Sequence, residues 1–369
     1  MARIVLENIK KVFNQTIVAL DNISLSIEDR EYVSILGTSG SGKTTLLRII
    51  AGFESPETGK VFFDGQDVSL FPPEKRNIGF VFQDFALFPH LSVWENVAYG
   101  PKIKGLGREQ VNAIGRQTLE IVGLFSRKDS FPHELSGGMK QRVGLARAMA
   151  SGSKILLMDE PLGSLDARIK RTLKTELRNW VKELGLTAIH VGHSQLEAME
   201  VSDRLVIMDK GRIIQSGPPE EIYKNPNSIF VADFISESNF LTGTIENIKN
   251  QHLTIGICPD SRLQSLHKNF KLKQKVVVSF RPEEVKIHQR LPNDPCLKGS
   301  LIKKRFLQGR LCFTVRLVNQ QSITVSLAPS SHNSVCKEGE VLYMTVSPSR
   351  VLLFPYPKSG LKQALRTFL

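Results

Sequence analysis

One short segment near the N-terminus constrains the fold of this chain more than any other. Residues 37–44 read Gly-Thr-Ser-Gly-Ser-Gly-Lys-Thr, which fits the phosphate-binding pattern G-x-x-x-x-G-K-[ST]. The apolar run Tyr32–Leu36 precedes it and predicts a strand, and Lys43–Ala51 follows with the apolar spacing of a helix. The segment therefore stands in the context of strand, loop and helix that the pattern requires.

The residue types of this loop are those that bind polyphosphate. Glycines let backbone N–H groups close around phosphate oxygens, and the N-terminus of the helix adds its partial positive charge. Lys43 is expected to reach the β- and γ-phosphates, and Thr44 to ligate Mg²⁺. A chance glycine-rich turn is the alternative, which the context disfavours. The residues expected to bind ATP here are Gly37, Thr38, Ser39, Gly40, Ser41, Gly42, Lys43, Thr44 and Thr45.

Two adjacent acids end a second apolar run. Ile155–Met158 predicts a buried strand that delivers Asp159 to its C-terminal end, directly before Glu160. Asp159 is expected to hold Mg²⁺, and Glu160 to orient or deprotonate an attacking water. Alone, two such acids are better explained as the cap of the next helix. Beside a phosphate loop, the catalytic interpretation is favoured.

A third segment opens a predicted helix with a serine and two glycines. Ser136 precedes Gly137 and Gly138, and apolar residues then recur through Met149. Serine suits a helix N-cap, and the exposed N–H groups and helix dipole that follow attract an anion. The chain therefore contains a second predicted anion-binding surface.

Together, in this order, the three segments resemble the ATP-binding subunits of ABC transporters, and the resemblance covers essentially the whole chain. The signature sequence of that family is similar to Leu-Ser-Gly-Gly-Met-Lys-Gln-Arg at 135–142. The resemblance implies that Ser136, Gly137 and Gly138 of one copy cover the γ-phosphate of ATP bound to a second copy. ATP is then expected to join a head-to-tail homodimer, and a single chain to hydrolyse it poorly.

Several further site residues follow from the resemblance. Gln83 matches the glutamine loop, which senses Mg²⁺ and the attacking water, and His193 matches the histidine that contacts the γ-phosphate. Phe13 takes the place of the aromatic that stacks on adenine. Asp166 lies in Ser164-Leu165-Asp166, which matches the family's short loop that touches the opposite subunit. The implied catalytic residues are Glu160, His193 and Gln83, and the implied Mg²⁺ ligands are Thr44, Gln83 and Asp159.

Each of these residues also has a structural alternative. Phe13 suits a core position, Gln83 a polar loop, Asp166 a helix start and His193 a satisfied buried histidine. Only the joint occurrence of all four, in the order of the family, favours the functional interpretation.

The chain departs from the family pattern at three positions. Met139 stands where glutamine is usual, and Gly192-His193-Ser194 replaces Thr-His-Asp. Ser194 lacks the carboxylate that often accompanies the histidine, which puts the turnover rate in question. His190 competes with His193 for the histidine role, and the sequence that follows favours His193.

The chain is long enough for two domains, and its texture changes near residue 235. Residues 1–235 are expected to form an α/β P-loop NTPase core of the ABC type, with a helical subdomain inserted at about 85–150. Residues 236–369 read as short β-rich runs and predict an all-β, OB-like barrel domain with a regulatory role.

The C-terminal region resembles that of importer ATPases. Residues 234–243 and 280–285 (Phe-Arg-Pro-Glu-Glu-Val) are similar to the linker and β domain of importers for polyamines, ferric iron, sulfate and sugars, most of all the spermidine/putrescine type. The resemblance implies transmembrane permease partners and, indirectly, a solute-binding protein. The apolar residues after Gln83, including Phe85 and Phe88, are expected either to dock on the permease or to be core.

Composition excludes several other classes. No run of about 18 apolar residues and no signal peptide occur, so the chain is expected at the cytoplasmic face of the inner membrane as a peripheral subunit. The net charge of the chain is +13. Residues 1–235 contain 29 Lys and Arg against 28 Asp and Glu, so the excess of basic residues lies after Ile235. A solvated basic face is favoured over nucleic acid. A soluble ABC ATPase that acts on ribosomes or DNA usually has two phosphate loops, whereas this sequence contains one. A GTPase is disfavoured because the guanine-reading sequence N-K-x-D does not occur.

Overall fold

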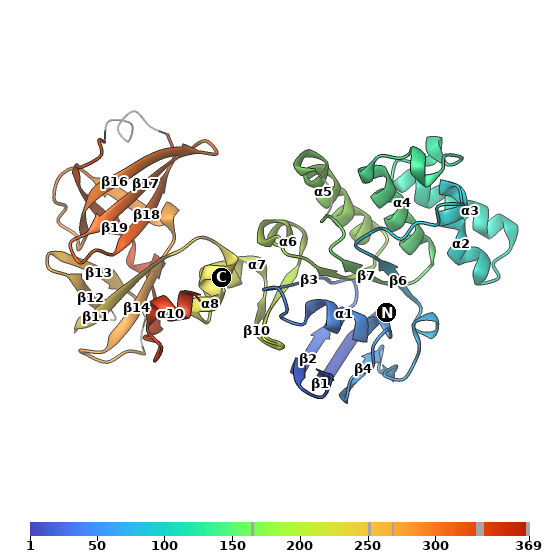
Figure 1. Cartoon of the computed structure of the whole chain (residues 1–369), viewed down its shortest axis with the longest axis horizontal. Helices are drawn as coiled ribbons and strands as arrows, with labels where there is room; N and C mark the ends of the chain where they lie inside the picture. The colour runs from blue at the N-terminus through green and yellow to red at the C-terminus, as the bar shows by residue number, and fades with distance from the viewer. Residues whose placement is uncertain (164–165, 250–251, 268, 330–335, 367–369) are drawn as a thin grey trace. The chain divides into compact units, whose positions relative to one another are not determined.

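The structure, a computed structural model, describes residues 1–163, 166–249, 252–267, 269–329 and 336–366. The chain divides into two compact units, Met1–Ile222 and Tyr223–Leu369 (Figure 1). Each unit has hydrophobic clusters of its own. No helix in the described ranges is apolar over a length that would cross a membrane.

A six-stranded sheet forms the centre of the first unit, in the order β10-β9-β3-β8-β7-β6. All pairs are parallel except β9 with β10. Every residue of β3 and of β8 is buried, as in a sheet covered on both faces. This confirms the predicted α/β core. The strands are β3 (Tyr32–Gly37), β6 (Ile78–Val81), β7 (Ile155–Asp159), β8 (Thr187–Val191), β9 (Arg204–Asp209) and β10 (Arg212–Gly217).

A second sheet of four antiparallel strands, in the order β2-β1-β4-β5, was not predicted from the sequence. The pairing of β1 with β2 shifts register between Leu6 and Ile9 and again further along, so the alternation of apolar and polar residues is interrupted. The strands are β1 (Ile4–Phe13), β2 (Ile17–Ile27), β4 (Thr58–Phe63) and β5 (Gln66–Asp67).

Helices cover the central sheet. The predicted α1 (Lys43–Ala51) has the expected bounds, because Gly42 and Gly52 cap its two ends in the left-handed conformation. Residues 101–150 contain helices and no strand. A capping box of Ser92 and Glu95 starts α2. The other helices are α2 (Val93–Ile103), α3 (Arg108–Ile121), α4 (Gly137–Ala150), α5 (Ala167–Glu183) and α6 (Gln195–Val201).

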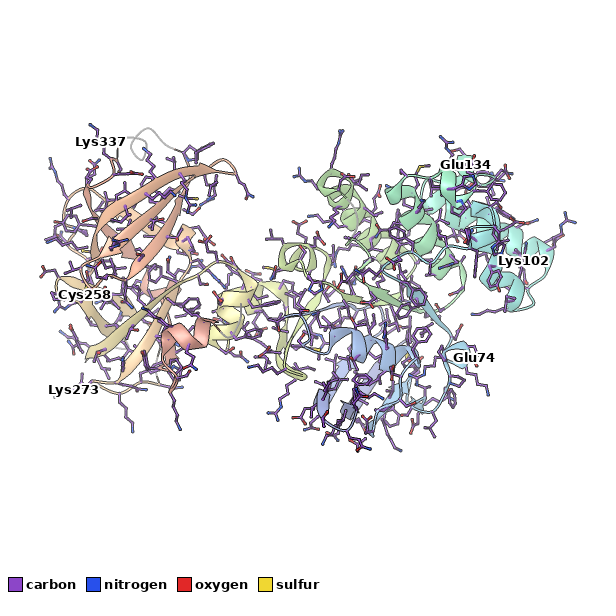
Figure 2. All side chains as sticks on the ribbon, in the orientation of Figure 1. Glu74, Lys102, Glu134, Cys258, Lys273 and Lys337 are labelled. Atoms are coloured by element: carbon purple, nitrogen blue, oxygen red, sulfur yellow. The ribbon has the colours of Figure 1, made fainter. Side chains whose placement is uncertain are left out.

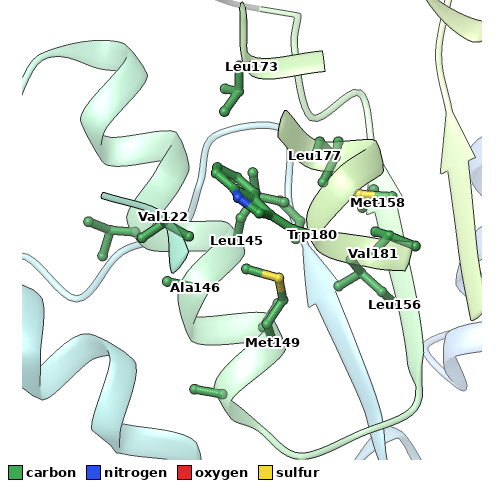
Figure 3. Packing of buried hydrophobic residues seen from close by; sticks show 14 of the residues in the cluster. Val122, Leu145, Ala146, Met149, Leu156, Met158, Leu173, Leu177, Trp180 and Val181 are labelled. Carbon is green, nitrogen blue, oxygen red and sulfur yellow. The ribbon is translucent and has the colours of Figure 1, made fainter. Parts of the chain in front are cut away.

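The main core of this unit lies between helices α4 and α5 and strand β7. Leu145 and Met149 of α4 pack with Leu177 and Trp180 of α5 and with Met158 of β7 (Figure 3). Apolar faces of two helices thereby cover one face of the sheet, which fixes the position of α4 beside the strand that carries the acidic pair.

The second unit contains two five-stranded antiparallel sheets, β13-β12-β11-β14-β20 and β15-β19-β16-β17-β18, around one shared core. This confirms the all-β prediction. The strands are β11 (Asn239–Lys249), β12 (His252–Cys258), β13 (Ser261–Ser265), β14 (Lys275–Phe280), β15 (Val285–His288), β16 (Leu297–Leu307), β17 (Arg310–Leu317), β18 (Ser322–Leu327), β19 (Val341–Val346) and β20 (Leu352–Pro355). The remaining elements are the helices α7 (Pro219–Lys224), α8 (Ile229–Ile235) and α10 (Leu361–Arg366), and the 3-10 turns η1 (Pro73–Lys75), η2 (Phe125–Arg127), η3 (Pro132–Glu134), η4 (Pro282–Glu284) and η5 (Pro348–Arg350).

The division between the units lies before the predicted boundary of 235/236. Helix α8 packs on the strands that follow it, because Ala232 shares a buried cluster with Val277 and Phe354. Arg281 adds a hydrogen bond from Nη1 to the carbonyl oxygen of Ala232, at 2.7 Å. Residues 223–235 therefore belong by packing to the β-rich unit.

The second unit contains nearly all of the basic excess of the chain. Lys273 and Lys337 project from opposite ends of the unit (Figure 2). All four cysteines are free.

Candidate functional site

The predicted phosphate loop connects the end of β3 to the start of α1. Its close contacts with neighbouring backbone require glycine at two positions. A Cβ atom at Gly42, where φ is 96°, would lie 2.4 Å from the carbonyl oxygen of Ala19. One at Gly37 would lie 2.2 Å from that of Met208. The loop is therefore packed against β2 and β9, with the N-terminus of α1 at its open side.

Lys43 is buried within the loop. Its Nζ donates to the carbonyl oxygens of Gly37 and Thr38, each at 2.9 Å. Burial lowers the pKa of Lys43, and the carboxylates of Glu160 and Asp159 oppose this shift. The loop carbonyls only partly compensate the buried ammonium for its lost water. An anion that enters the loop supplies the negative partner that this ammonium needs.

Thr44 and Asp159 lie together beside the loop. The hydroxyl of Thr44 donates to Asp159 Oδ1 at 3.4 Å. Burial raises the pKa of Asp159, and the charge of Glu160 raises it further. A hydroxyl and a carboxylate are hard oxygen ligands, and Mg²⁺ typically takes one or two such ligands together with phosphate oxygens. The described residues contain no group of three or more His, Cys, Asp or Glu placed to hold a metal.

Glu160 occupies the centre of the predicted catalytic set. Its Oε1 lies 2.5 Å from Nε2 of His193, and its Oε2 accepts from Nε2 of Gln83 at 3.3 Å. Its φ of 46° is left-handed, a conformation that a non-glycine residue keeps only when its surroundings impose it. A hydrogen bond from its N–H to the carbonyl oxygen of Val191, at 2.9 Å, is part of that constraint.

The three residues come from three neighbouring strands. Gln83 follows β6, Glu160 follows β7 and His193 follows β8, and these strands are adjacent and parallel. The carboxyl ends of parallel strands share one edge of the sheet, which brings the three side chains together.

The two histidines that the sequence left in competition occupy different environments. His193 is exposed and contacts Glu160. His190 is buried inside β8, where its Nδ1 lies 3.4 Å from the hydroxyl of Tyr32 and burial lowers its pKa to about 4. Only His193 is placed to act on Glu160.

The departures from the family pattern have local structural explanations. Ser194 caps α6, since its side chain accepts from the N–H of Glu197, a role that serine fills as well as aspartate. A Cβ atom at Gly192 would lie 3.2 Å from Nε2 of His190. Met139 packs against the core between the helices.

A cavity of about 340 to 370 Å³ occurs in each unit, but only that of the first unit contains the predicted residues. Its lining places Phe13 beside the phosphate loop and adds two residues that were not predicted, Ile17 and Val18, which are 60% and 49% exposed. The signal available in the sequence was a pair of apolar residues shortly after Phe13. The cavity is lined by Phe13, Ile17, Val18, Ala19, Ser39, Gly40, Ser41, Gly42, Lys43, Thr44, Thr45, Glu160 and His193.

The serine-glycine segment lies outside this lining. Ser136 caps α4, and its side chain accepts from the N–H of Met139 at 3.3 Å. A Cβ atom at Gly138 would lie 2.9 Å from a methyl group of Ile169 in α5, so the start of α4 is packed closely on α5.

Asp166 caps α5 and accepts from the N–H groups of Arg168 and Ile169, both at 3.0 Å. This is the helix-start alternative of the sequence analysis, and it leaves the expected contact with an opposite subunit a prediction. Ser164 and Leu165, of the same predicted loop, lie outside the described residues.

Comparisons with known proteins agree with this geometry. A family model described as ABC transporter matches residues 20–163. The spermidine/putrescine import ATP-binding protein PotA of Nostoc sp. is 39% identical over 340 residues, which are 89% of this chain and 87% of the relative. The protein of the same name in Thermobifida fusca is 37% identical over 356 residues, which are 95% of this chain and 93% of the relative. The Fe(3+) ions import ATP-binding protein FbpC 1 of Haemophilus influenzae is 45% identical over 244 residues, which are 66% of this chain and 74% of the relative.

Solved structures of a bacterial ABC transporter cassette, MJ0796, match the same fold. The dimeric cassette has a TM-score of 0.53 at 33% identity, and its post-hydrolysis dimer with ADP and Pi a TM-score of 0.52 at 32%. Each match covers 58% of this chain and 98% of the cassette. The chain therefore belongs to the ABC transporter family, as an ATP-hydrolysing subunit of the import type.

Proposed function

We propose that this chain couples hydrolysis of MgATP to the uptake of a polyamine, spermidine or putrescine. The contacts of Glu160 with His193 and Gln83, beside the loop that holds Lys43, carry the catalytic part of the proposal. The polyamine follows from relatives named for spermidine and putrescine import, whose similarity extends over up to 95% of this chain. Ferric iron is the second candidate, since an Fe(3+) importer subunit is 45% identical, but over only 66% of the chain.

In the proposed reaction the loop binds the phosphates and the sheet edge performs the chemistry. Backbone N–H groups of residues 37–45 and the ammonium of Lys43 hold the β- and γ-phosphates. Phe13 stacks on the adenine. Thr44, Gln83 and Asp159 hold Mg²⁺, which when bound neutralises charge on the phosphate oxygens.

Glu160 accepts the proton of the attacking water, and Gln83 orients that water through the same carboxylate. His193 holds Glu160 on its other oxygen and contacts the γ-phosphate. Their positions at the ends of three adjacent strands support this division of roles.

The second half of each site comes from a second copy of the chain. The cavity contains the phosphate loop but none of Ser136, Gly137, Gly138 or Asp166, so one chain presents an incomplete set. The N-terminus of α4, capped by Ser136, suits the γ-phosphate of a partner's ATP. The dimeric state of the related cassette supports this head-to-tail assembly.

Transport requires a membrane-embedded partner. The segment after Gln83 is the proposed docking site for the permease, since Phe85, Leu87 and Phe88 are only half-buried and Pro89 is exposed. The chain then works at the cytoplasmic face of the cell membrane, with a solute-binding protein as an indirect partner.

The remaining proposals concern the domains. The first unit, Met1–Ile222, acts as the nucleotide-binding domain, and the second, Tyr223–Leu369, as a regulatory β domain. The basic residues of the second unit form a solvated surface in this proposal, with no nucleic acid bound.

A capture experiment tests the proposal. Glu160→Gln keeps the shape of the side chain but removes the base, so this variant is expected to bind MgATP, to lose nearly all turnover and to remain a dimer. Used as bait with MgATP in solubilised membranes, it is expected to recover proteins with several membrane spans. Recovery of ribosomes or nucleic acid alone would instead indicate a soluble ABC ATPase. Normal turnover by the variant would refute Glu160 as the base.

A further inference from the structure

The segment that follows Gln83 has an unusual backbone conformation. Phe85 and Ala86 have φ of 59° and 44°, in the left-handed region that residues other than glycine rarely adopt. Gln83 itself donates to Glu160. Gln83 stands two residues before Phe85, and the left-handed segment keeps its conformation only if other residues hold it.

Arg147 of α4 supplies that hold. Its Nη1 donates to the carbonyl oxygen of Ala86 at 2.7 Å, and its Nη2 to that of Phe85 at 3.0 Å. The guanidinium also lies over the ring of Phe88, 5.3 Å from its centre. One planar group thus binds both left-handed residues and an aromatic ring of the same segment, which the rigid fork of arginine permits.

Two helices hold this segment from different directions. Gly144, three residues before Arg147, is close enough that a Cβ atom there would lie 3.5 Å from the carbonyl oxygen of Phe85. From α2, the buried Asn96 accepts from the N–H of Phe88 at 2.9 Å and donates to its carbonyl oxygen at 3.1 Å. Residues 85–88 are therefore attached to α4 and α2, and a movement of α4 is transmitted to them.

We propose that Arg147 is a positioning residue that couples the two ATP sites of the dimer; this inference rests on the dimer proposed above. Arg147 stands eleven residues after Ser136 on one helix, a distance of about 16 Å along its axis. When Ser136 engages the γ-phosphate of the partner's ATP, α4 moves as one body. Arg147 passes this movement to residues 85–88 and so sets Gln83 beside Glu160 in its own site.

The test compares variants of the full chain in steady-state ATP hydrolysis. Arg147→Gln removes both carbonyl contacts, and Arg147→Lys keeps the charge but replaces the fork with a single ammonium. The matched control is Arg116→Gln in α3. Arg116 also stands 5.3 Å from a phenylalanine ring, that of Phe125, but its 2.8 Å ion pair is with Glu120 of its own helix.

The measured quantities are kcat, the Hill coefficient for MgATP, the Kd for ADP by calorimetry and the melting temperature. Both Arg147 variants are expected to lower kcat about tenfold to a hundredfold. Their Hill coefficient falls from above 1 in the wild type towards 1. Binding of ADP to the phosphate loop stays within about twofold, because Lys43 and its loop are untouched. Arg116→Gln is expected to match the wild type in all four quantities.

Two results overturn the inference. One is a wild-type kcat and Hill coefficient in a folded Arg147 variant, and the other is a lower kcat with an unchanged Hill coefficient. If Arg147→Gln does not fold, Arg147→Lys decides. Gel filtration of Glu160→Gln with MgATP separates this failure from a failure of the proposed function. A monomer there overturns the dimer and the coupling together, whereas a dimer with uncoupled wild-type kinetics overturns the coupling alone.

Discussion

Nε2 of His193 lies 2.5 Å from Oε1 of Glu160, although 32 residues separate them in the sequence. The parallel register of β7 and β8, in which Asp159 is paired with Val191, brings the two residues that follow these strands to the same edge of the sheet. The contact favours His193 over His190 for the proposed histidine role, and the carboxylate of Glu160 is the point at which the three strand ends meet.

Removal of this contact is expected to reduce turnover and not nucleotide binding. His193→Ala leaves Glu160 without one of its two side-chain partners, and kcat should fall by about a hundredfold. His190→Gln is the control, because His190 is buried in the strand and Gln retains an acceptor for the hydroxyl of Tyr32. ATPase assays and ADP titrations of both variants test this. A larger loss of kcat in His190→Gln would reverse the assignment.

Asp159, a proposed Mg²⁺ ligand, is expected to reduce the stability of the nucleotide-free protein. Its folded-state pKa is raised by burial and by Glu160, so ionised Asp159 destabilises the fold at neutral pH. Asp159→Asn should raise the melting temperature without nucleotide by a few degrees, as about 1 kcal/mol does in a domain of this size. The gain should vanish as the pH falls and Asp159 becomes protonated.

The same variant is expected to bind ATP less tightly when Mg²⁺ is present, because an amide is a poorer ligand than a carboxylate. Thermal melts at pH 7 and pH 4, with and without MgATP, measure both effects. An Asp159→Asn variant that is less stable at pH 7 and unchanged in Mg²⁺-dependent binding would contradict the prediction.

His190 is expected to make the first unit sensitive to acid. Its pKa is lowered by burial to about 4 from the ordinary value of 6.5, so the unfolded chain takes up a proton before the folded one. Stability should be full above pH 6.5 and fall by about 3 kcal/mol as the pH drops to 4. Urea unfolding at several pH values, compared between the wild type and His190→Gln, checks this. An equal acid sensitivity of both proteins would locate the titrating group elsewhere.

Gly192 is expected to be coupled to His190. Threonine, usual at this position in the family, would place its Cβ atom 3.2 Å from Nε2 of His190 and force the imidazole to move. Gly192→Thr alone should destabilise the protein by about 1–3 kcal/mol. In combination with His190→Ala the loss should be smaller than the sum of the two single losses. Urea midpoints of the four proteins measure the coupling, and strict additivity would disprove it.

Elements with strong local signals could be predicted from the sequence. Helix α1 has left-handed glycines at both ends, and its bounds agree with the prediction. The sheet of β1, β2, β4 and β5 was not predicted, since register shifts in β1 remove the alternation on which such a prediction rests. Ile17 and Val18 were missed for the same reason, because they begin the unpredicted β2.

The sequence by itself determined the chemistry of the phosphate loop, because the eight residues from Gly37 to Thr44 are consecutive and their function depends on local backbone geometry. The tertiary structure alone decided which distant side chains meet. Gln83 and Glu160 are 77 residues apart and bond only because β6 and β7 are neighbours in the sheet. The tertiary structure also gave His193 and His190 different environments, and it placed Ser136 outside the cavity lining. Strand order and burial arise from long-range packing and hydrogen bonding, which no local pattern encodes.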